Sequence, residues 1–185
     1  MQVEINPSEY TVLIVDDTIA NVLLLKVLIG NQKYRIVTAG NGMEALQAVE
    51  KESPDLILLD IMMPGMNGYE VAEKLKADPQ TQEIPIIFLT ALNSTNDIVK
   101  GFKTGASDYI SNPFNKEELL IRVTHQISLI AAKRLIASQM KELQSTIRGR
   151  DRLYSVIAHD LRSPMGSLKM IFNLLMACLL YTSDA

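Results

Sequence analysis

Five short apolar runs, separated by segments with helical spacing, occupy the first 124 residues of the chain. The runs are TVLIVDD (11–17), YRIVTAG (34–40), DLILLD (55–60), IPIIFLT (84–90) and SDYIS (107–111). The first, third and fourth are continuously apolar, which is typical of parallel strands that are buried on both faces. Strands that alternate with helices predict an α/β fold, a doubly wound sheet of five parallel strands with ligands at their carboxyl ends.

The segments between these runs carry the signals of helix starts and ends. The expected helices are 18–31, 42–53, 68–78 and 94–106. The first ends in Gly-Asn, the second and third stop before Pro54 and Pro79, and the fourth opens with Ser, Thr and Asn. Such residues are favoured at helix caps and just beyond helix ends, so these boundaries support the α/β interpretation.

From NKEELLIRV (115–123) onward no strand signal returns, and one long helix is expected. Apolar residues recur there in alternating steps of four and three, a heptad seam in which Arg150 and Pro164 occupy two places. The seam contains Ile136, Met140, Leu143, Ile147, Tyr154, Ile157, Leu161, Leu168, Ile171 and Leu175. Upstream, Val123, Ile127 and Ile130 keep the same step, but the phase slips between 130 and 136.

A seam of this length favours a coiled coil, so we expect the helix to pair with its copy in a homodimer. The alternative is a single amphipathic helix that folds back on its own domain.

Charge and composition exclude several classes of partner. The net charge is −3, which gives no basic surface for nucleic acid or an anionic membrane. The most apolar late segment, MIFNLLMACLLY (170–181), is too short to span a bilayer, and no signal peptide is recognised at the N-terminus. The lone Cys178 cannot form an internal disulfide. We therefore expect a cytoplasmic protein without nucleic-acid or membrane contacts.

Acidic residues stand where two of the expected strands end. Asp16 and Asp17 close the first strand and Asp60 closes the third, so three carboxylates should converge at one edge of the sheet. Like charges are costly at close range unless a cation or a proton relieves them, and oxygen ligands suit Mg²⁺. A carboxylate can also attack phosphorus to form an acyl phosphate. Thr90 ends the fourth strand and can donate its hydroxyl to a phosphoryl oxygen. Alternatively, Asp16 and Asp17 cap the first helix.

The segments VLIVDD, LLLDIMMPGMNGYE, PIIFLTA and GASDYISNPF together resemble a response-regulator receiver domain over residues 10–124. The resemblance implies a flavodoxin-like sheet of strand order 2-1-3-4-5, with Asp60 as the phosphoacceptor. It also implies that Asp16, Asp17 and the Met62 carbonyl help to hold Mg²⁺. Thr90 and Tyr109 resemble the pair that responds to phosphorylation by a hydroxyl shift and an aromatic rotation. The implied partner is a cognate histidine kinase or a phosphotransfer protein.

One position departs from the receiver pattern. Receivers usually carry Lys before the proline that follows the fifth strand, and Asn112 occupies this place. An amide offers only neutral donors, and Lys116 lies on the far side of a turn, so we expect weak coupling between phosphorylation and a conformational switch. The resemblance also implies a cis peptide bond before Pro113.

The stretch SVIAHDLRSPMGSLK (155–169) places a histidine on the polar side of the long helix. With Ile157 and Leu161 in the seam, His159 falls at heptad position f, farthest from a partner helix. Asp160 can accept a hydrogen bond from the ring, and Pro164 should loosen the helix just beyond. The alternative is an incidental surface histidine.

The same stretch resembles the H-box of a histidine kinase dimerisation and phosphotransfer domain. The resemblance implies that His159 is phosphorylated, that Asp160 is its acid/base partner and that Ser163 orients water for dephosphorylation. Nothing after residue 177 resembles the second helix or the ATP-binding boxes of such a kinase.

The expected organisation has four parts. These are a receiver domain (1–124), a coiled-coil linker (125–150), a partial phosphoacceptor domain (151–177) and a tail of uncertain origin (178–185).

The leading interpretation is the front of a hybrid two-component histidine kinase that lacks its ATP-binding domain. The alternative is a stand-alone receiver that acts as a dimeric binding module or phosphate sink. A phosphatase with an aspartyl nucleophile is disfavoured, because such enzymes usually carry Asp-x-Asp after the first strand.

Overall fold

The computed structural model describes residues 5–90, 104–111, 113 and 115–181, except for the side chains of 161, 163 and 177–181. The chain divides into two compact units, Met1–Lys133 and Arg134–Ala185. The first unit is an α/β domain and the second is helical.

A five-stranded parallel sheet forms the centre of the first unit. Its strands are β1 (Thr11–Val15), β2 (Arg35–Ala39), β3 (Leu56–Asp60), β4 (Ile86–Thr90) and β5 (Asp108–Ser111). The strand order is β2-β1-β3-β4-β5, which confirms the doubly wound topology expected from the sequence. The three continuously apolar runs form the inner strands, which are almost completely buried, whereas β2 and β5 at the edges are partly exposed.

Helices α1 (Ile19–Gly30), α2 (Gly42–Glu52) and α3 (Gly68–Ala77) lie at the expected places, and a short 3₁₀ turn, η1 (Pro7–Glu9), precedes β1. The Asn67 side chain accepts from the Glu70 N–H and the Glu70 carboxylate accepts from the Asn67 N–H, so a reciprocal cap starts α3. Asn41 caps α2 in a similar way by accepting from the Glu44 N–H. The helix expected over 94–106 falls largely outside the described residues.

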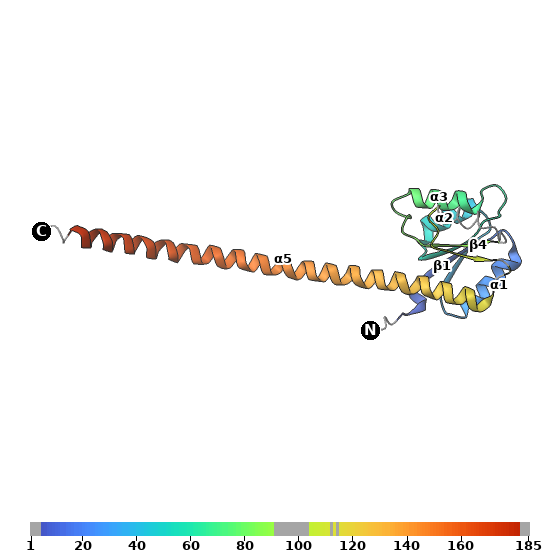
Figure 1. Ribbon diagram of the computed structural model, residues 1–185, viewed down its shortest axis with the longest axis horizontal. Coiled ribbons are helices and arrows are strands. Elements are labelled where there is room, and N and C mark those ends of the chain that lie inside the picture. The colour runs from blue at the N-terminus through green and yellow to red at the C-terminus, as the bar shows by residue number, and fades with distance from the viewer. Residues whose placement is uncertain (1–4, 91–103, 112, 114, 182–185) are drawn as a thin grey trace. The chain divides into compact units, whose positions relative to one another are not determined.

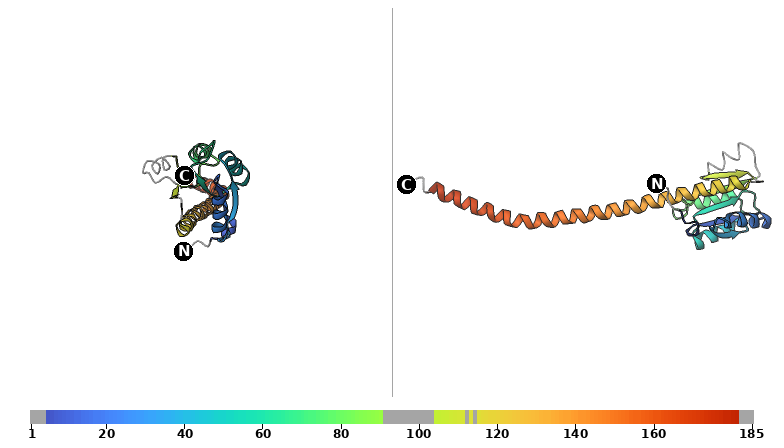
Figure 2. Two further views of the ribbon diagram at one scale, coloured as in Figure 1. Left: turned by 90° about the vertical axis from the view of Figure 1, so that its right-hand side faces the viewer. Right: turned by 90° about the horizontal axis from the view of Figure 1, so that it is seen from below.

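Two apolar cores lie on opposite faces of the sheet. Helix α1 and the first turns of helix α5 (Lys116–Tyr181) cover one face, and α2 and α3 cover the other. Figure 1 shows these two helix layers with the sheet between them, and Figure 2 shows the same unit from two further sides. This layered arrangement places the carboxyl ends of β1 and β3 side by side.

The first turns of α5 explain the slip in the heptad phase. Leu119, Val123 and Ile127 are fully buried against the sheet, and Ala131 is nearly so. Val123 and Ile127 therefore belong to the core of the first unit and are not the start of the seam. The seam from Ile136 onward has a separate phase, and its described side chains are exposed.

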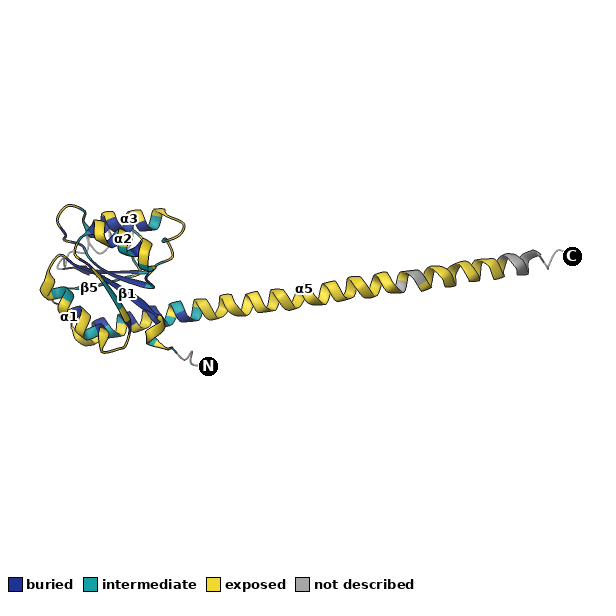
Figure 3. Ribbon diagram, turned by 180° about the vertical axis from the view of Figure 1, so that it is seen from behind, coloured by how far each residue is buried: buried dark blue, intermediate teal, exposed yellow. Residues whose placement is uncertain are grey.

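The second unit consists of the rest of α5. Its described side chains are exposed along the helix, including the large apolar residues of the seam (Figure 3). The helix does not end at Pro164, and it extends to Tyr181, four residues past the expected limit of 177. Leucine is a strong helix former, which favours this extension through Leu179 and Leu180. Among the described residues, no helix is long and apolar enough to cross a membrane.

Candidate functional site

Three carboxylates meet where β1 and β3 end. Val15 pairs with Leu59 in the sheet, so Asp16 and Asp17, which follow β1, and Asp60, which ends β3, emerge at the same edge. Each of the three offers a carboxylate oxygen, and these oxygens all lie within 4.8 Å of one another. Asp16 is buried, Asp60 is half-buried and Asp17 is exposed, so the cluster opens to solvent on one side. The convergence expected from the sequence is confirmed.

Two donors fix the Asp16 carboxylate. The backbone N–H of Thr18 donates to Oδ1 at 2.7 Å, and the Asn21 side-chain amide donates to Oδ2 at 3.0 Å. Thr18 is the N-cap residue of α1 and makes no side-chain cap bond. Asp16 thus holds the residue before α1 without being the N-cap of that helix, and it also contributes an oxygen to the cluster.

Burial and neighbouring charge alter the acidity of Asp60. Burial, followed by the negative charge of Asp16, raises the pKa of the Asp60 carboxyl from 3.8 to about 6. Hydrogen bonds from the backbone N–H groups of Met62 and Ile61 oppose this rise, and Asp17 adds to it. The raised pKa of the carboxyl that closes β3 therefore reflects burial first and repulsion within the cluster second.

The cluster has the chemical character of a divalent cation site. Its ligands are all oxygens, which hard cations such as Mg²⁺ prefer, and their crowding disfavours the fully ionised state without a cation. The donor set therefore fits the Mg²⁺ that the sequence resemblance implied.

The other expected site residues of the first unit lie on β4, on β5 and in the loop after β3. Thr90 closes β4 one residue beyond the partner of Asp60 and is buried. Tyr109 lies on β5, opposite Phe88 of β4, and is half-buried. Met62 follows Asp60 in the loop after β3, where its N–H bonds to the Asp60 carboxylate. Asn112 and the peptide bond before Pro113 lie outside the described residues.

Sequence reasoning missed two residues that shape the site. Asn21 orients Asp16 from the first turn of α1, and nothing in its local pattern distinguishes it from a surface asparagine. Gly68, at the start of α3, is the second, because a Cβ there would lie 2.3 Å from the backbone oxygen of Asp60. The signal for Gly68 was present in the MNGYE segment, where Asn-Gly precedes a helical pattern.

His159 and Asp160 lie on α5 in the second unit. His159 Nδ1 is 3.4 Å from Asp160 Oδ1, and their side chains are 84% and 72% exposed. The imidazole is therefore in solvent beside a carboxylate, and because the described seam residues are exposed as well, the heptad position of His159 stays a prediction. Ser163 is helical, and its side chain lies outside the description.

Comparisons with known proteins agree on the first unit. The family model for the response regulator receiver domain matches residues 12–124. Response regulator PleD of Caulobacter vibrioides is 44% identical over 112 residues, which cover 60% of this chain and 25% of PleD. DNA-binding response regulator MtrA of Mycobacterium tuberculosis is 42% identical over 112 residues, covering 60% of this chain and 48% of MtrA. The chain thus matches between a quarter and a half of these relatives.

Solved structures give the same picture. The signal receiver domain of a signal transduction histidine kinase from Syntrophus aciditrophicus is 34% identical with a TM-score of 0.61, covering 64% of this chain and 90% of that one. A CheY-like response regulator receiver domain protein from Methanospirillum hungatei is 28% identical with a TM-score of 0.63, covering 67% and 98%. With its sheet order, its acidic cluster and a family match over 12–124, the chain belongs to the response regulator receiver domain family of two-component signalling.

Proposed function

We propose that this chain accepts a phosphoryl group on Asp60 from a phosphohistidine donor. A carboxylate oxygen of Asp60 attacks phosphorus, the phosphorus–nitrogen bond of the donor breaks, and the departing imidazole nitrogen takes up a proton. The product is an aspartyl phosphate. The observation that carries the proposal is the convergence of the Asp16, Asp17 and Asp60 carboxylate oxygens within 4.8 Å at the ends of β1 and β3.

Asp16, Asp17, Asp60 and the Met62 carbonyl are the proposed ligands of Mg²⁺. When bound, the cation supplies positive charge that offsets the charge of the transferring group. The hydrogen bonds from Thr18 and Asn21 keep the Asp16 carboxylate in place before a ligand arrives, which reduces the cost of ordering the site.

The buried Thr90 hydroxyl is the proposed donor to a phosphoryl oxygen. Tyr109 is the proposed aromatic residue that moves together with Thr90 when Asp60 is phosphorylated.

The direct test is the position of the phosphate after treatment with a small acyl-phosphate donor and Mg²⁺. Peptide mass spectrometry is expected to place a single, hydroxylamine-sensitive phosphate on Asp60. Labelling of an Asp60→Asn variant at an acid-stable site, as strong as that of the unmodified chain, would refute the proposal.

An apolar stripe on α1 supports a helical protein as the donor. Ile19, Leu23 and Val27 repeat every four residues and are 76%, 58% and 61% exposed. The stripe begins two residues after Asp17, so a partner seated on it lies close to the acidic cluster. A cognate histidine kinase or a phosphotransfer protein that presents its histidine from a helical surface fits this arrangement.

This partner is tested by separating docking from chemistry. A Leu23→Gln, Val27→Gln variant should lose transfer from a purified phosphorylated donor by about tenfold or more, and it should keep labelling by the small donor. Met43→Gln on α2, where the side chain is similarly exposed, is the matched control. Equal losses with both donors would show that α1 acts on the chemistry and would contradict docking on this stripe.

We further propose that the chain is the front of a hybrid histidine kinase, with His159 as a second phosphoacceptor. Support comes from the H-box pattern, from the exposed imidazole 3.4 Å from Asp160, and from a similar receiver that belongs to a histidine kinase. Asp160 is the proposed acid/base partner and Ser163 the proposed dephosphorylation residue. A hydroxylamine-resistant, acid-labile phosphate that disappears in a His159→Gln variant is the expected result. Signalling that continues unchanged in the His159→Gln variant would contradict the proposal that His159 is a second phosphoacceptor.

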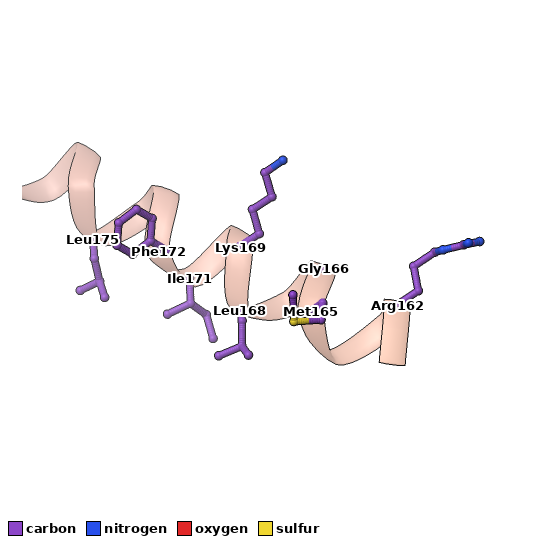
Figure 4. A pocket seen from close by; sticks show the side chains of 8 residues that line it. All are labelled: Arg162, Met165, Gly166, Leu168, Lys169, Ile171, Phe172 and Leu175. Atoms are coloured by element: carbon purple, nitrogen blue, oxygen red, sulfur yellow. The ribbon is translucent and has the colours of Figure 1, made fainter. Parts of the chain in front are cut away.

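The exposed seam supports homodimerisation through α5. Leu168, Ile171 and Leu175 project to the same side of the helix in Figure 4, where they line a shallow apolar surface. Seam residues such as Leu143 and Ile147 are also exposed at heptad spacing. A second copy supplies the same seam, which makes the pairing self-complementary.

The second candidate is a stand-alone receiver that acts as a dimeric binding module or phosphate sink. The observation that favours it is the limit of the family match at residue 124, which leaves the H-box segment outside. In this case the helix only dimerises, and His159 carries no phosphate. The expected compartment, the cytoplasm, stays a prediction for either candidate.

A further inference from the structure

Arg122 on α5 connects the helix to the proposed switch residue Tyr109. Its Nη1 donates to Asp108 Oδ1 at 2.6 Å, and its Nε donates to Glu118 Oε1 at 2.9 Å. The guanidinium carbon lies 5.7 Å from the centre of the Tyr109 ring, within the range of a cation–π contact. The guanidinium is therefore held by carboxylates from β5 and α5 while it faces an aromatic ring on β5.

Asp108 ties this arrangement to the backbone of the switch residue. The same Oδ1 atom that accepts from Arg122 also accepts from the Tyr109 N–H at 2.9 Å. The Asp108 and Arg122 side chains are only 17% and 32% exposed, so solvent screens the pair less than it screens an ordinary surface pair. The hydrogen bond to Asp108 raises the pKa of Arg122 above its usual value, so its charge is permanent.

We propose that Arg122 is a positioning residue that holds the Tyr109 ring in the place it occupies in this structure and transmits the movement of that ring to α5. The inference rests on the proposed phosphorylation of Asp60, because it supplies the event that moves Tyr109. In this proposal the ring leaves the guanidinium when Asp60 is phosphorylated, so that the contact exists only before phosphorylation. By thermodynamic linkage, a contact that exists only before phosphorylation stabilises the unphosphorylated state and opposes the change to the phosphorylated state.

The guanidinium is suited to this role in a way that an ammonium is not. Its planar group can face an aromatic ring while its N–H groups reach carboxylates in the same plane. A lysine at this position keeps one charge but cannot donate to Asp108 and Glu118 in this geometry while facing the ring. Arg122→Lys therefore preserves net charge and tests the shape of the contact.

The first measurement concerns the ring itself and needs no phosphate. With ¹³C-labelled tyrosine rings, assigned with a Tyr109→Phe variant, Arg122→Gln and Arg122→Lys should both shift the Tyr109 ring signals. Arg148→Gln, a change at an exposed arginine on the same helix, should leave them in place. Tyr109 signals unchanged in both Arg122 variants would overturn the restraint.

The second measurement concerns the switch. Loss of the contact should tighten binding of the phosphate mimic beryllofluoride by about two- to fivefold, the range expected for one cation–π contact. In a Tyr109→Leu background, which has no ring to hold, Arg122→Gln should change this affinity by less than about 1.5-fold. An unchanged or weaker affinity in Arg122→Gln, or an equal gain in the Tyr109→Leu background, would overturn the proposed role.

Failure of the proposed function and failure of the proposed role of Arg122 give different results in this experiment. A chain that binds no beryllofluoride, with or without Arg122, refutes the proposed function and with it the switch role of Arg122. A chain that binds beryllofluoride at Asp60 with equal affinity in all Arg122 variants retains the proposed function and refutes only the role of Arg122.

Discussion

Gly68 lies directly against Asp60, so that a Cβ on Gly68 would stand 2.3 Å from the Asp60 backbone oxygen and 2.9 Å from the Ile61 Cα. The Gly68 N–H also donates to the Ile61 carbonyl at 3.0 Å. The backbone at the start of helix α3 therefore lies in direct contact with the backbone at the end of β3. The site depends on this glycine because the loop between them carries Met62, whose N–H bonds to the Asp60 carboxylate.

A Gly68→Ala substitution should displace this loop and destabilise the first unit. The free energy of unfolding should fall by about 1–3 kcal/mol, the usual cost of forcing a methyl group into a packed site. Labelling of Asp60 by a small phosphodonor should slow as well. Urea unfolding of Gly30→Ala, where the new Cβ meets only an ordinary 3.5 Å contact, is the control. Equal stability of the two variants would contradict the close contact.

The raised pKa of Asp60 predicts a pH dependence of stability in the metal-free protein. Because the folded state holds this proton more tightly than the unfolded state, the contribution of Asp60 is full below pH 3.8 and is lost as pH rises through about 6. Asp60→Asn has no such loss. Its stability advantage should therefore grow over this window to on the order of 1 kcal/mol, allowing for partial exposure.

Thermal or urea unfolding of both proteins from acid to neutral pH measures this difference. Addition of Mg²⁺ at neutral pH should stabilise the unmodified chain more than Asp60→Asn, since the metal favours the ionised carboxylate. If the stability advantage of Asp60→Asn over the unmodified chain is constant with pH, burial and Asp16 do not shift the pKa of Asp60.

The homodimer predicts that two seam residues control the oligomeric state. Leu143→Gln together with Ile147→Gln should give monomers with an intact first unit, because burial of seam residues is the main source of pairing energy. Val156 and Met170 lie at the outward heptad position c and are 52% and 66% exposed. The double glutamine variant at these two positions should remain dimeric in sedimentation. A monomeric unmodified chain at micromolar concentration would rule out the coiled coil.

The amide at Asn112 predicts a weak response to phosphorylation. A neutral donor in place of an ammonium should remove about one or two kcal/mol of phosphate-dependent stabilisation. Asn112→Lys should therefore enlarge the NMR shift changes that beryllofluoride causes around Thr90 and Tyr109. If the unmodified chain already shifts as far as the lysine variant, the amide does not limit the switch.

The fold and the acidic cluster could be predicted because their signals are local and mutually consistent. Buried parallel strands require continuous apolar runs, and the carboxyl ends of such strands lie at the same edge of the sheet. The sequence alone therefore predicts that Asp16 and Asp60 lie close together. The buried face of Val123 and Ile127 was harder to predict, because a helical period reveals a face but not what covers it.

The contacts that complete the site could not be predicted, because they join residues with no mark in their local pattern. Asn21 reaches Asp16 across the first turn of α1, and Arg122 reaches Asp108 and Tyr109 from a helix that follows β5. Each depends on the final angle between elements, which side-chain packing determines. Such residues become visible only when the backbone is in place.

Phosphorylation of Asp60 is proposed to take place in a carboxylate site that requires a divalent cation. Mass spectrometry of the intact chain, treated with a small acyl-phosphate donor and Mg²⁺, tests it most directly. We predict one hydroxylamine-sensitive phosphate, located on Asp60, that is absent both in Asp60→Asn and after chelation of the metal. A hydroxylamine-sensitive phosphate that persists in Asp60→Asn, or labelling of Asp60 that is equally fast without the metal, would contradict metal-dependent phosphorylation of Asp60.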